Sequence, residues 1–507
     1  MNTDILTEKT IELAVTGKLI KQEESDCSPA SDIVEKIRDE RQRMLSAGTL
    51  RMKNIKVNTV IFKGGDGLYY EKLQGGKQRC IQNEIPFDLP QGWAWCRLGS
   101  LFRTITGNTP PTGDKTLYNG DYPFYKPSDL GSGLNVDKAA ETVTEAGLEQ
   151  GHLVPEHSVL VTCIGTVGKT GYIRKKGIFN QQINAILPNN MISSEYTYFS
   201  MCADYMQKQI KANSSSATMP ILNKTKFDNL LFILPPLPQQ KKIAEKLKQV
   251  TAAAKRIQSE KEELERLIER TKEKVLDMAV KGRLVPHEVA EEDLNRERDD
   301  EGGKRPFKKY GCASDNSYYE KLKVFSSEMP CSWGFARLKE LGSIAGGGTP
   351  KTSVSDFWNG DIPWITPSDI GGGEKGIVNT VANGERSISE QGLTSSTARL
   401  VPKGAVLYSC RAPIGYIAIA ENPLATSQGI KAFNPSSEIS SEYIYFCLKA
   451  LTPYIVKNAS GASFKEISAA QFGDTPIPVP PKKEQEQICS RIKEIFEGLD
   501  KIKVNLT

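Results

Sequence analysis

The residues of this chain that most resemble a reactive site form two short glycine-rich motifs. Residues 165–170 read Gly-Thr-Val-Gly-Lys-Thr, like the end of a phosphate-binding loop. Such a loop needs a glycine five positions before its Gly-Lys pair, so that backbone amides can curl around phosphate, and Cys163 stands there instead. The glycines at 346–348 lack the strand–helix context of a dinucleotide fingerprint, so they predict a flexible turn.

Groups suited to acid–base or nucleophilic chemistry are also sparse. Asp129 and Asp369 each follow Pro-Ser and could be read as nuclease carboxylates, but aspartate at that place more often caps a turn. Residues 422–424 read Asn-Pro-Leu and lack the Pro-Pro-aromatic word that an amino-methylating enzyme presents to a flipped base. No Ser/His/Asp or Cys/His set stands out, and three scattered histidines are too few for a zinc site: His152, His157 and His287. The sequence predicts a non-catalytic chain without a metal or cofactor of its own.

The composition is that of an ordinary globular chain. Its 507 residues predict two or three domains, and 38% apolar and 25% charged residues are typical values. The net charge of +5 is only a mild lean toward polyanions. No apolar run approaches the roughly 18 residues of a membrane helix, and the polar start at Met1 is no signal peptide. Ten cysteines without a Cys-x-x-Cys indicate reduced thiols, so we expect a cytoplasmic protein.

The elements that must position any site are organised around residues 239–282. Apolar residues recur there at alternating steps of four and three, the spacing of a coiled-coil seam. Three prolines between 235 and 238 precede the segment, and Gly282 stands where a C-terminal cap belongs. A helix of about 44 residues would be roughly 65 Å long and could not bury its seam alone. The seam residues are Ile243, Leu247, Val250, Ile257, Leu264, Ile268, Val275 and Met278.

The two ends of the chain repeat this helix in pieces. Residues 14–20 (Ala-Val-Thr-Gly-Lys-Leu-Ile) match residues 279–285 (Ala-Val-Lys-Gly-Arg-Leu-Val). The ends together rebuild the central helix, so the sequence predicts an antiparallel helical coiled coil and a cyclic layout with a pseudo-twofold axis. The C-terminal seam follows its central counterpart by 245 residues and comprises Ile488, Ile492, Ile495, Leu499 and Ile502.

The segments between the helices are duplicates of each other. Thr109-Pro110 matches Thr349-Pro350, and Asn-Gly-Asp and Pro-Ser-Asp words recur at the same spacing. Trp93 matches Trp333, and both are expected in the core. Strand-like runs at 158–163 and 405–410 and helices at 195–211 and 442–456 predict two mixed α/β heads of about 150 residues each.

These patterns divide the chain into seven segments. Residues 21–85 are a linker with a short helix at 32–45, and residues 286–328 are a shorter linker. The other predicted boundaries are 1–20 and 481–507 for the distal helical parts, 86–235 and 329–480 for the heads, and 236–285 for the central helix.

This arrangement resembles the specificity subunit of type I restriction-modification systems. The matching words are Gly-Asn-Thr-Pro at 107–110, Gly-Gly-Thr-Pro at 347–350 and Pro-Pro-Leu-Pro-Gln-Gln-Lys-Lys-Ile at 235–243. Ala-Val-x-Gly-[Lys/Arg]-Leu at 14–19 and 279–284 also fits, so the resemblance covers nearly the whole chain. The departure is the difference in linker length, which leaves the role of the helix at 32–45 open.

The resemblance implies a prokaryotic DNA-binding subunit with partners. Each head would be a target recognition domain that reads one half of a bipartite, asymmetric site in double-stranded DNA. The helices would dock two modification subunits, which methylate adenine with S-adenosylmethionine. Restriction subunits, which use ATP and Mg²⁺, would join them, and this chain would hold none of these cofactors.

The heads carry side chains suited to DNA, with hydroxyl and basic groups for phosphates and amides and arginines for base edges. Residues identical in both heads are candidates for maintaining the fold or for contacting phosphates. Residues that differ at equivalent positions, such as Lys126/Thr366 and Ile164/Arg411, are candidates for reading different half-sites. The first head supplies Thr109, Lys115, Tyr125, Lys126, Ser128, Lys169, Gln181, Ser215, Thr218 and Lys224. The second supplies Thr349, Lys351, Trp364, Thr366, Ser368, Arg411, Gln428, Ser463 and Lys465.

Two other functions compete with DNA recognition. A self-sufficient DNA methyltransferase or nuclease would need the motifs that are missing here. If the chain were a purely structural coiled-coil scaffold, its two duplicated heads would have no function. A methylation assay on the chain alone and a DNA-binding titration at several salt concentrations discriminate among the three.

Overall fold

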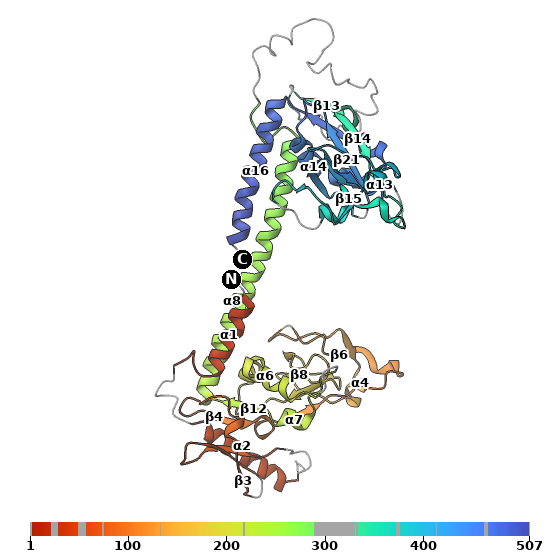
Figure 1. The fold of residues 1–507 in the computed structure, drawn as a ribbon. Helices are drawn as coiled ribbons and strands as arrows, with labels where there is room; N and C mark the ends of the chain where they lie inside the picture. The colour runs from red at the N-terminus through yellow and green to blue at the C-terminus, as the bar shows by residue number, and fades with distance from the viewer. Residues whose placement is uncertain are drawn as a thin grey trace. The chain divides into compact units, whose positions relative to one another are not determined.

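A computed structural model describes the chain at residues 3–21, 29–48, 57–73, 76–131, 133–215, 219–287, 330, 333–371, 376–411, 413–460 and 465–505 (Figure 1). The chain forms two compact units, Met1–Glu260 and Lys261–Thr507, each with its own apolar core. The long helix α8, Leu237–Val280, contributes its first part to one unit and the remainder to the other. None of the helices in the described ranges is long and apolar enough to cross a membrane.

The first unit contains the head that the sequence places at 86–235. Its core sheet has the strand order β5-β11-β8-β9, and a second sheet has the order β10-β6-β7. The strands of these sheets are β5 Thr104–Thr106, β6 Tyr118–Tyr125, β7 Glu141–Val143, β8 Val159–Thr162, β9 Thr170–Tyr172, β10 Ile178–Phe179 and β11 Ile183–Ile186. Its helices are α3 Leu98–Leu101, α4 Glu145–Gln150, α5 Ser194–Cys202, α6 Asp204–Asn213 and α7 Lys224–Asp228.

The second unit repeats this topology. Its sheets have the orders β14-β21-β18-β19-β16 and β17-β15-β20. The strands are β14 Gly342–Gly346, β15 Trp358–Ile365, β16 Thr380–Val381, β17 Arg386–Ile388, β18 Val406–Ser409, β19 Ile417–Ala420, β20 Ala425–Thr426 and β21 Ile430–Pro435. Its helices are α12 Pro367–Gly371, α13 Glu390–Thr394, α14 Ser441–Lys457 and α15 Ala469–Gly473. The mixed α/β duplication that the sequence predicts is confirmed.

Each head also has a two-stranded sheet at its junction with a long helix. In the first unit β4 (Ala94–Arg97) pairs with β12 (Leu231–Leu234), and in the second β13 (Gly334–Arg337) pairs with β22 (Pro476–Val479). Both pairs are antiparallel, and the second strand of each leads directly into α8 or into α16, Lys482–Asn505. The sheet therefore joins the first strand of a head to the helix that follows it.

Matched polar contacts fix the helices to the heads. Ser193 and Ser440 cap α5 and α14 by accepting hydrogen bonds from the backbone of Tyr196 and Tyr443. In turn, Gln240 on α8 accepts a 2.9 Å bond from the Ser193 backbone N–H, and an equivalent glutamine on α16 does the same for Ser440. The predicted helix at 195–211 is broken at Ala203, whose extended backbone separates α5 from α6, whereas α14 is continuous.

The long helices bury or half-bury most of the predicted seam. Ile243, Leu247, Ile268, Val275, Ile488 and Ile492 are buried, and the remaining seam residues are half-buried except for two. Ile257 and Ile502 are 44% and 46% exposed. Ile257 precedes Gln258, which Thr3 contacts at the start of the N-terminal helix, whereas Ile502 lies in the last turn of its own helix, α16. Helix α1, Thr3–Val15, lies alongside α8 within the first unit, with Thr3 in contact with Gln258 (Figure 1).

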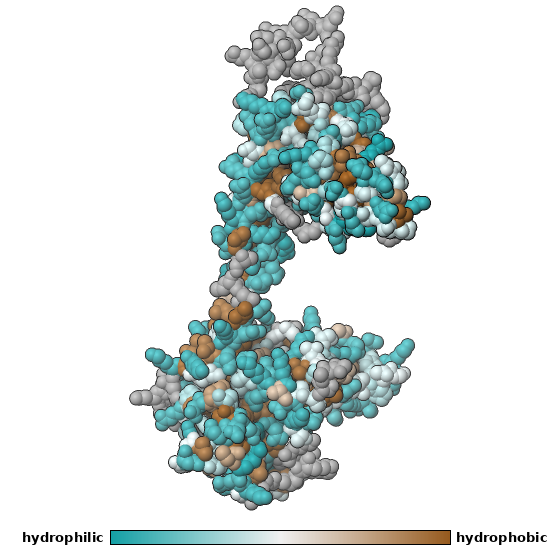
Figure 2. Space-filling model, in the orientation of Figure 1, coloured by the Kyte–Doolittle hydropathy of each residue, from teal (hydrophilic) through white to brown (hydrophobic). Residues whose placement is uncertain are grey.

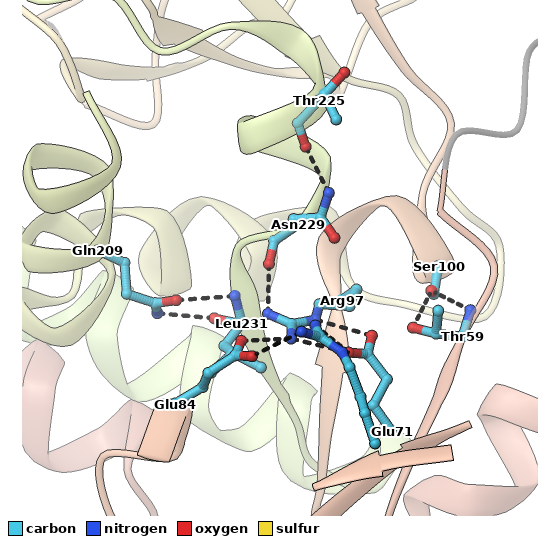
Figure 3. A network of polar contacts seen from close by, with 10 residues as sticks. Thr59, Glu71, Glu84, Arg97, Ser100, Gln209, Thr225, Asn229 and Leu231 are labelled. Atoms are coloured by element: carbon cyan, nitrogen blue, oxygen red, sulfur yellow. Dashed lines mark hydrogen bonds and ion pairs between the residues drawn. The ribbon is translucent and has the colours of Figure 1, made fainter. Parts of the chain in front are cut away.

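A small sheet and a helix precede the first head. The sheet comprises β1 Val60–Lys63, β2 Tyr69–Lys72 and β3 Gln78–Cys80, and the helix is α2, Ala30–Ser46, close to the predicted 32–45. Buried Glu71 of β2 accepts hydrogen bonds of 3.1 Å from Arg97 of β4, and Arg97 also donates to Glu84 and to the Asn229 carbonyl (Figure 3). This buried ion network fixes the small sheet to the head.

Candidate nucleic-acid interface

The Gly-Asn-Thr-Pro word of the first head forms a loop packed tightly on the strand end opposite it. The backbone N–H of Gly107 donates to the Ile183 carbonyl at 3.1 Å, and that of Asn108 to the Phe179 carbonyl at 2.9 Å. A Cβ at Gly107 would overlap the carbonyl oxygens of Phe179 and Asn180, so only glycine fits there. The loop thereby brings the Thr109 hydroxyl to Gln181, to whose Oε1 it donates at 2.7 Å.

The second head builds the same pair from Thr349 and Gln428, whose side chains are hydrogen-bonded in the same sense. Gly347 and Gly348 lie so close to the backbone at 397–398 and 426–427 that a Cβ on either would overlap it. The flexible turn predicted for 346–348 is therefore the end of β14 at Gly346 followed by a close-packed loop at Gly347 and Gly348. Since the glutamine oxygen accepts from threonine, each exposed amide still offers its N–H groups to a ligand.

A second loop lies next to this pair in each head. The backbone N–H of Asn180, beside Gln181, donates to the Tyr125 carbonyl at the end of β6, and that of Ser427 donates to Ile365 at the end of β15. The residues that follow are Lys126, Pro127 and Ser128 in the first head, with Ser128 exposed. The Lys169 ammonium donates to the Pro127 carbonyl at 2.9 Å, which places a positive charge at this loop.

The two aspartates of the Pro-Ser-Asp words cap these loops. Asp129 accepts from the backbone N–H groups of Lys126 and Ala140 at 2.7 and 3.0 Å. Asp369 accepts from those of Thr366 and Glu385 at 2.7 and 2.9 Å. The turn-capping interpretation is confirmed, because both oxygens of each carboxylate are used by backbone donors.

The residues that resemble the end of a phosphate-binding loop also form a structural turn. Residues 165–169 connect β8 to β9, so a strand follows the lysine and not the helix that a phosphate-binding loop requires. Gly165 and Gly168 have φ of +77° and +89°. The Thr162 hydroxyl accepts from the Lys169 backbone at 2.9 Å, and Ser409 accepts from Tyr416 in the same way in the second head. Both heads therefore use a hydroxyl to close this turn.

We call Thr109, Lys126, Ser128, Lys169 and Gln181 the recognition surface of the first head. In the second head, Arg411, which is equivalent to Ile164, places its Nε next to Gly429, the neighbour of Gln428. The recognition surface of the second head is Thr349, Thr366, Ser368, Arg411 and Gln428. The structure therefore groups about half of the predicted DNA-binding residues on two equivalent loop clusters.

Other predicted residues lie elsewhere. Tyr125 is fully buried, with its hydroxyl donating to the Lys175 carbonyl, and Trp364 is 5% exposed. Both support the loops from below, and burial raises the pKa of the Tyr125 phenol. Lys224 is an ion-pair partner of Asp228 and contacts Thr104, so its charge is already compensated inside the head. The exposed candidates are Lys115, Ser215, Lys351 and Lys465, whereas Thr218 and Ser463 lie outside the described residues.

Sequence reasoning missed two features of the heads. In the first head, Arg174, Lys175 and Lys176 line a hollow of about 510 Å³ together with Tyr122 and Leu153. In the second, Arg386 lies over the ring of Trp358. The Arg-Lys-Lys run was visible in the sequence, but the position of Arg386 depends on strand register, which spacing along the chain does not reveal.

Comparisons with known proteins agree with this duplicated architecture. Residues 90–266 and 330–506 each match the family described as the Type I restriction modification DNA specificity domain. The MjaIX type I restriction enzyme specificity subunit of Methanocaldococcus jannaschii is 38% identical over 34% of this chain and 39% of its own length. The EcoDI specificity subunit of Escherichia coli is 22% identical over 82% of this chain and 83% of its own length.

A solved structure supports the fold. A chain from a study of complex assembly and conformational transition of the type I R-M system superposes with a TM-score of 0.57 at 19% identity, covering 83% of this chain and 94% of that one. The chain spans less than half the length of the first three curated relatives that it matches.

Two equivalent α/β heads with matching polar loops define a duplicated recognition protein. Since the family matches cover both halves, this chain belongs to the family of type I restriction-modification DNA specificity domains and carries two of them.

Proposed function

We propose that this chain is the non-catalytic specificity subunit of a type I restriction-modification complex, and that each head reads one half of a bipartite, asymmetric DNA site. The observation that carries the proposal is the repeated Thr–Gln pair. Thr109–Gln181 and Thr349–Gln428 occupy the same loop in heads whose neighbouring residues differ. One scaffold with two sets of side chains suits two different half-sites.

The shared and the differing residues have different tasks in this proposal. The threonines, serines and glutamine amides common to both heads fit phosphate oxygens, which every sequence presents. Lys126 and Thr366 occupy equivalent loop positions, and Ile164 and Arg411 another pair of equivalent positions. These differing residues suit base edges, where lysine and arginine pair with guanine.

We further propose that the helices form the predicted antiparallel coiled coil, complete the cyclic layout and dock two modification subunits. Lys272 of α8 pairs with Asp500 of α16 at 2.5 Å, and Glu269 with Lys503 at 2.9 Å, so residue numbers run in opposite directions within the second unit. On α1, Ile5, Leu6 and Leu13 are 42–52% exposed, and apolar surface is visible over this helix (Figure 2). A group of exposed apolar side chains on one helix is typical of a surface that contacts a partner protein.

The remaining parts of the proposal follow the resemblance. The domain boundaries at 86–235, 236–285 and 329–480 stand as proposed, with residues 1–20 and 481–507 as distal helical parts. S-adenosylmethionine would be supplied by the modification subunits, and ATP and Mg²⁺ would act in the restriction subunits. The complex would act in the prokaryotic cytoplasm.

Purification of this chain with and without its modification subunit tests the proposal. The chain alone should bind double-stranded DNA with an affinity that falls steeply as salt rises, and it should transfer no methyl groups. Adding the modification subunit and S-adenosylmethionine should produce methyladenine at one bipartite motif. Methyl transfer by the chain alone, or no dependence of the complex on this chain, would contradict the proposal.

A further inference from the structure

We infer that Arg386 is a specificity-determining residue of the second head, which reads the edge of a base in the half-site; the inference rests on the proposed function. Arg386 is the first residue of β17 and pairs with Trp364 of β15. Its guanidinium carbon lies 3.5 Å from the ring centroid of Trp358 and 6.0 Å from that of Trp364. Its position is fixed by two rings from the neighbouring strand.

The two tryptophans connect Arg386 to the recognition surface. Their ring centroids lie 5.2 Å apart with planes at 88°, so they pack edge to face. The Trp364 indole N–H donates to the Gly348 carbonyl at 2.9 Å, and that of Trp358 to the Lys351 carbonyl at 3.2 Å. These carbonyls flank the loop that carries Thr349. Arg386 is therefore one aromatic ring away from that loop.

The guanidinium remains available to a ligand. Arg386 is exposed, and no side chain or carbonyl among the described residues accepts a hydrogen bond from it. Stacking on a ring uses the face of the guanidinium and leaves the N–H fork at its edge free. That fork matches the two acceptors of guanine in the major groove, and stacking reduces the conformational freedom lost on binding.

The first head has the opposite charge at the same place. There β7 pairs with β6 so that Glu141 lies opposite Phe124, as Arg386 lies opposite Trp364. Glu141 forms an ion pair with Lys126, and Tyr118, at the position of Trp358, also bonds to the loop, donating to the Pro110 carbonyl at 2.7 Å. The aromatic support is kept while the charged residue changes. This is the expected behaviour of a position that reads different bases in the two heads.

The test maps methyladenines in the genome of a host carrying the complete modification complex with wild-type chain, R386Q, R386K or K449Q. Lys449 is the matched control, because it also lies over an aromatic ring of the second head, that of Tyr445, but on α14. R386Q should relax the motif at one base pair of one half-site, with discrimination there falling about tenfold or more. R386K should relax the same position, because it keeps the charge but loses the fork. K449Q should leave the motif unchanged.

Other outcomes contradict the inference. If R386Q lowers methylation uniformly without changing the motif, and R386K restores it, Arg386 contacts only phosphate. If R386Q changes nothing, Arg386 has no part in recognition. Equal melting temperatures of R386Q and wild type, with the first half-site retained, exclude unfolding as the cause of a relaxed motif. A wild-type complex that methylates no bipartite motif would contradict the proposed function and this inference together.

Discussion

The indole N–H of Trp333 donates a 2.9 Å hydrogen bond to Oε1 of Glu484, the buried acidic residue in the first turn of α16. The same oxygen lies 2.6 Å from Nδ1 of His287. In the first unit, Trp93 donates to Gln239 at 2.7 Å at the matching place in α8. Each head is thus joined to its helix by a tryptophan and one acceptor, a carboxylate in one unit and an amide in the other.

Replacing the acceptor tests this joint. Glu484→Gln keeps an oxygen for Trp333 and should lower the free energy of unfolding of the second unit by about 1 kcal/mol. Glu484→Ala leaves a buried indole N–H without a partner and should cost about 2–3 kcal/mol. Urea titrations followed by tryptophan fluorescence measure both. Equal losses in the two variants would show that the hydrogen bond contributes nothing.

The ion network below the first head should be equally sensitive. Glu71 is 1% exposed and binds the buried Arg97. Glu71→Gln removes one of the two carboxylates that pair with Arg97 and leaves Glu84, so we expect a loss of about 2–3 kcal/mol, measured by urea titration. The exposed control Glu149→Gln on α4 should change stability by less than about 0.5 kcal/mol. Similar effects of the two substitutions would contradict a structural role for the network.

The same carboxylate makes the first unit sensitive to acid. Burial disfavours the charged form of Glu71, but hydrogen bonds from Arg97, Thr59 and Arg79 outweigh burial and lower its pKa from 4.5 to about 2. Since the folded pKa lies below the unfolded value, the ionised group stabilises the fold above pH 4.5, and this contribution is lost between pH 4.5 and about 2. The stability difference between wild type and Glu71→Gln should shrink over that range. A constant difference from pH 7 to pH 3 would contradict this assignment.

Much of the architecture could be predicted because the chain repeats itself. The duplicated motifs predicted the two α/β heads, and the seam periodicity predicted the long helices. The break at Ala203 could not be foreseen, since the apolar pattern continues from α5 into α6, whereas α14 accommodates Pro453 without a break. The seam pattern predicts burial only on the helix face that packs against another helix, and not on the face that packs against a head. Phe496 of α16, which lies outside that pattern, is 3% exposed.

The recognition surface was predictable only in part, for a reason of geometry. Thr109 and Gln181 lie 72 residues apart in the sequence and meet because the strands pair. They could still be predicted as candidate DNA-binding residues, because both recur in the second head. Arg386 has no identical counterpart, so the repeat could not identify it. Tyr125 and Trp364 were predicted to contact DNA, but both side chains are buried at the ends of their strands.

The shared threonines should supply affinity without sequence preference. Thr109→Val and Thr349→Val remove one hydroxyl each from the recognition surfaces, so DNA binding by the complex should weaken several-fold on every sequence. Titrations of the complex with a duplex that carries the motif it methylates, and with a duplex of scrambled sequence, measure this loss of affinity. A change confined to the motif duplex would show that the threonines read bases.

Docking through α1 can be tested by charge. Leu6→Glu and Leu13→Glu place carboxylates on the exposed apolar face of α1, so binding of the modification subunit should weaken at least tenfold. Lys36→Glu on α2 is the control for an added negative charge at an exposed helix position. Pull-down or calorimetric affinities compare the three variants. Unchanged binding by both leucine variants would place the docking surface elsewhere.

The central claim is that each head reads its own half of the site. Residues 86–235 can be exchanged for the corresponding head of another member of the family, leaving the second head and the helices unchanged. Methyladenines in the genome of a host carrying the hybrid complex are then mapped at single-base resolution. The hybrid should methylate a motif in which one half-site is replaced and the other is retained. A motif altered in both halves, or in neither, would contradict the claim.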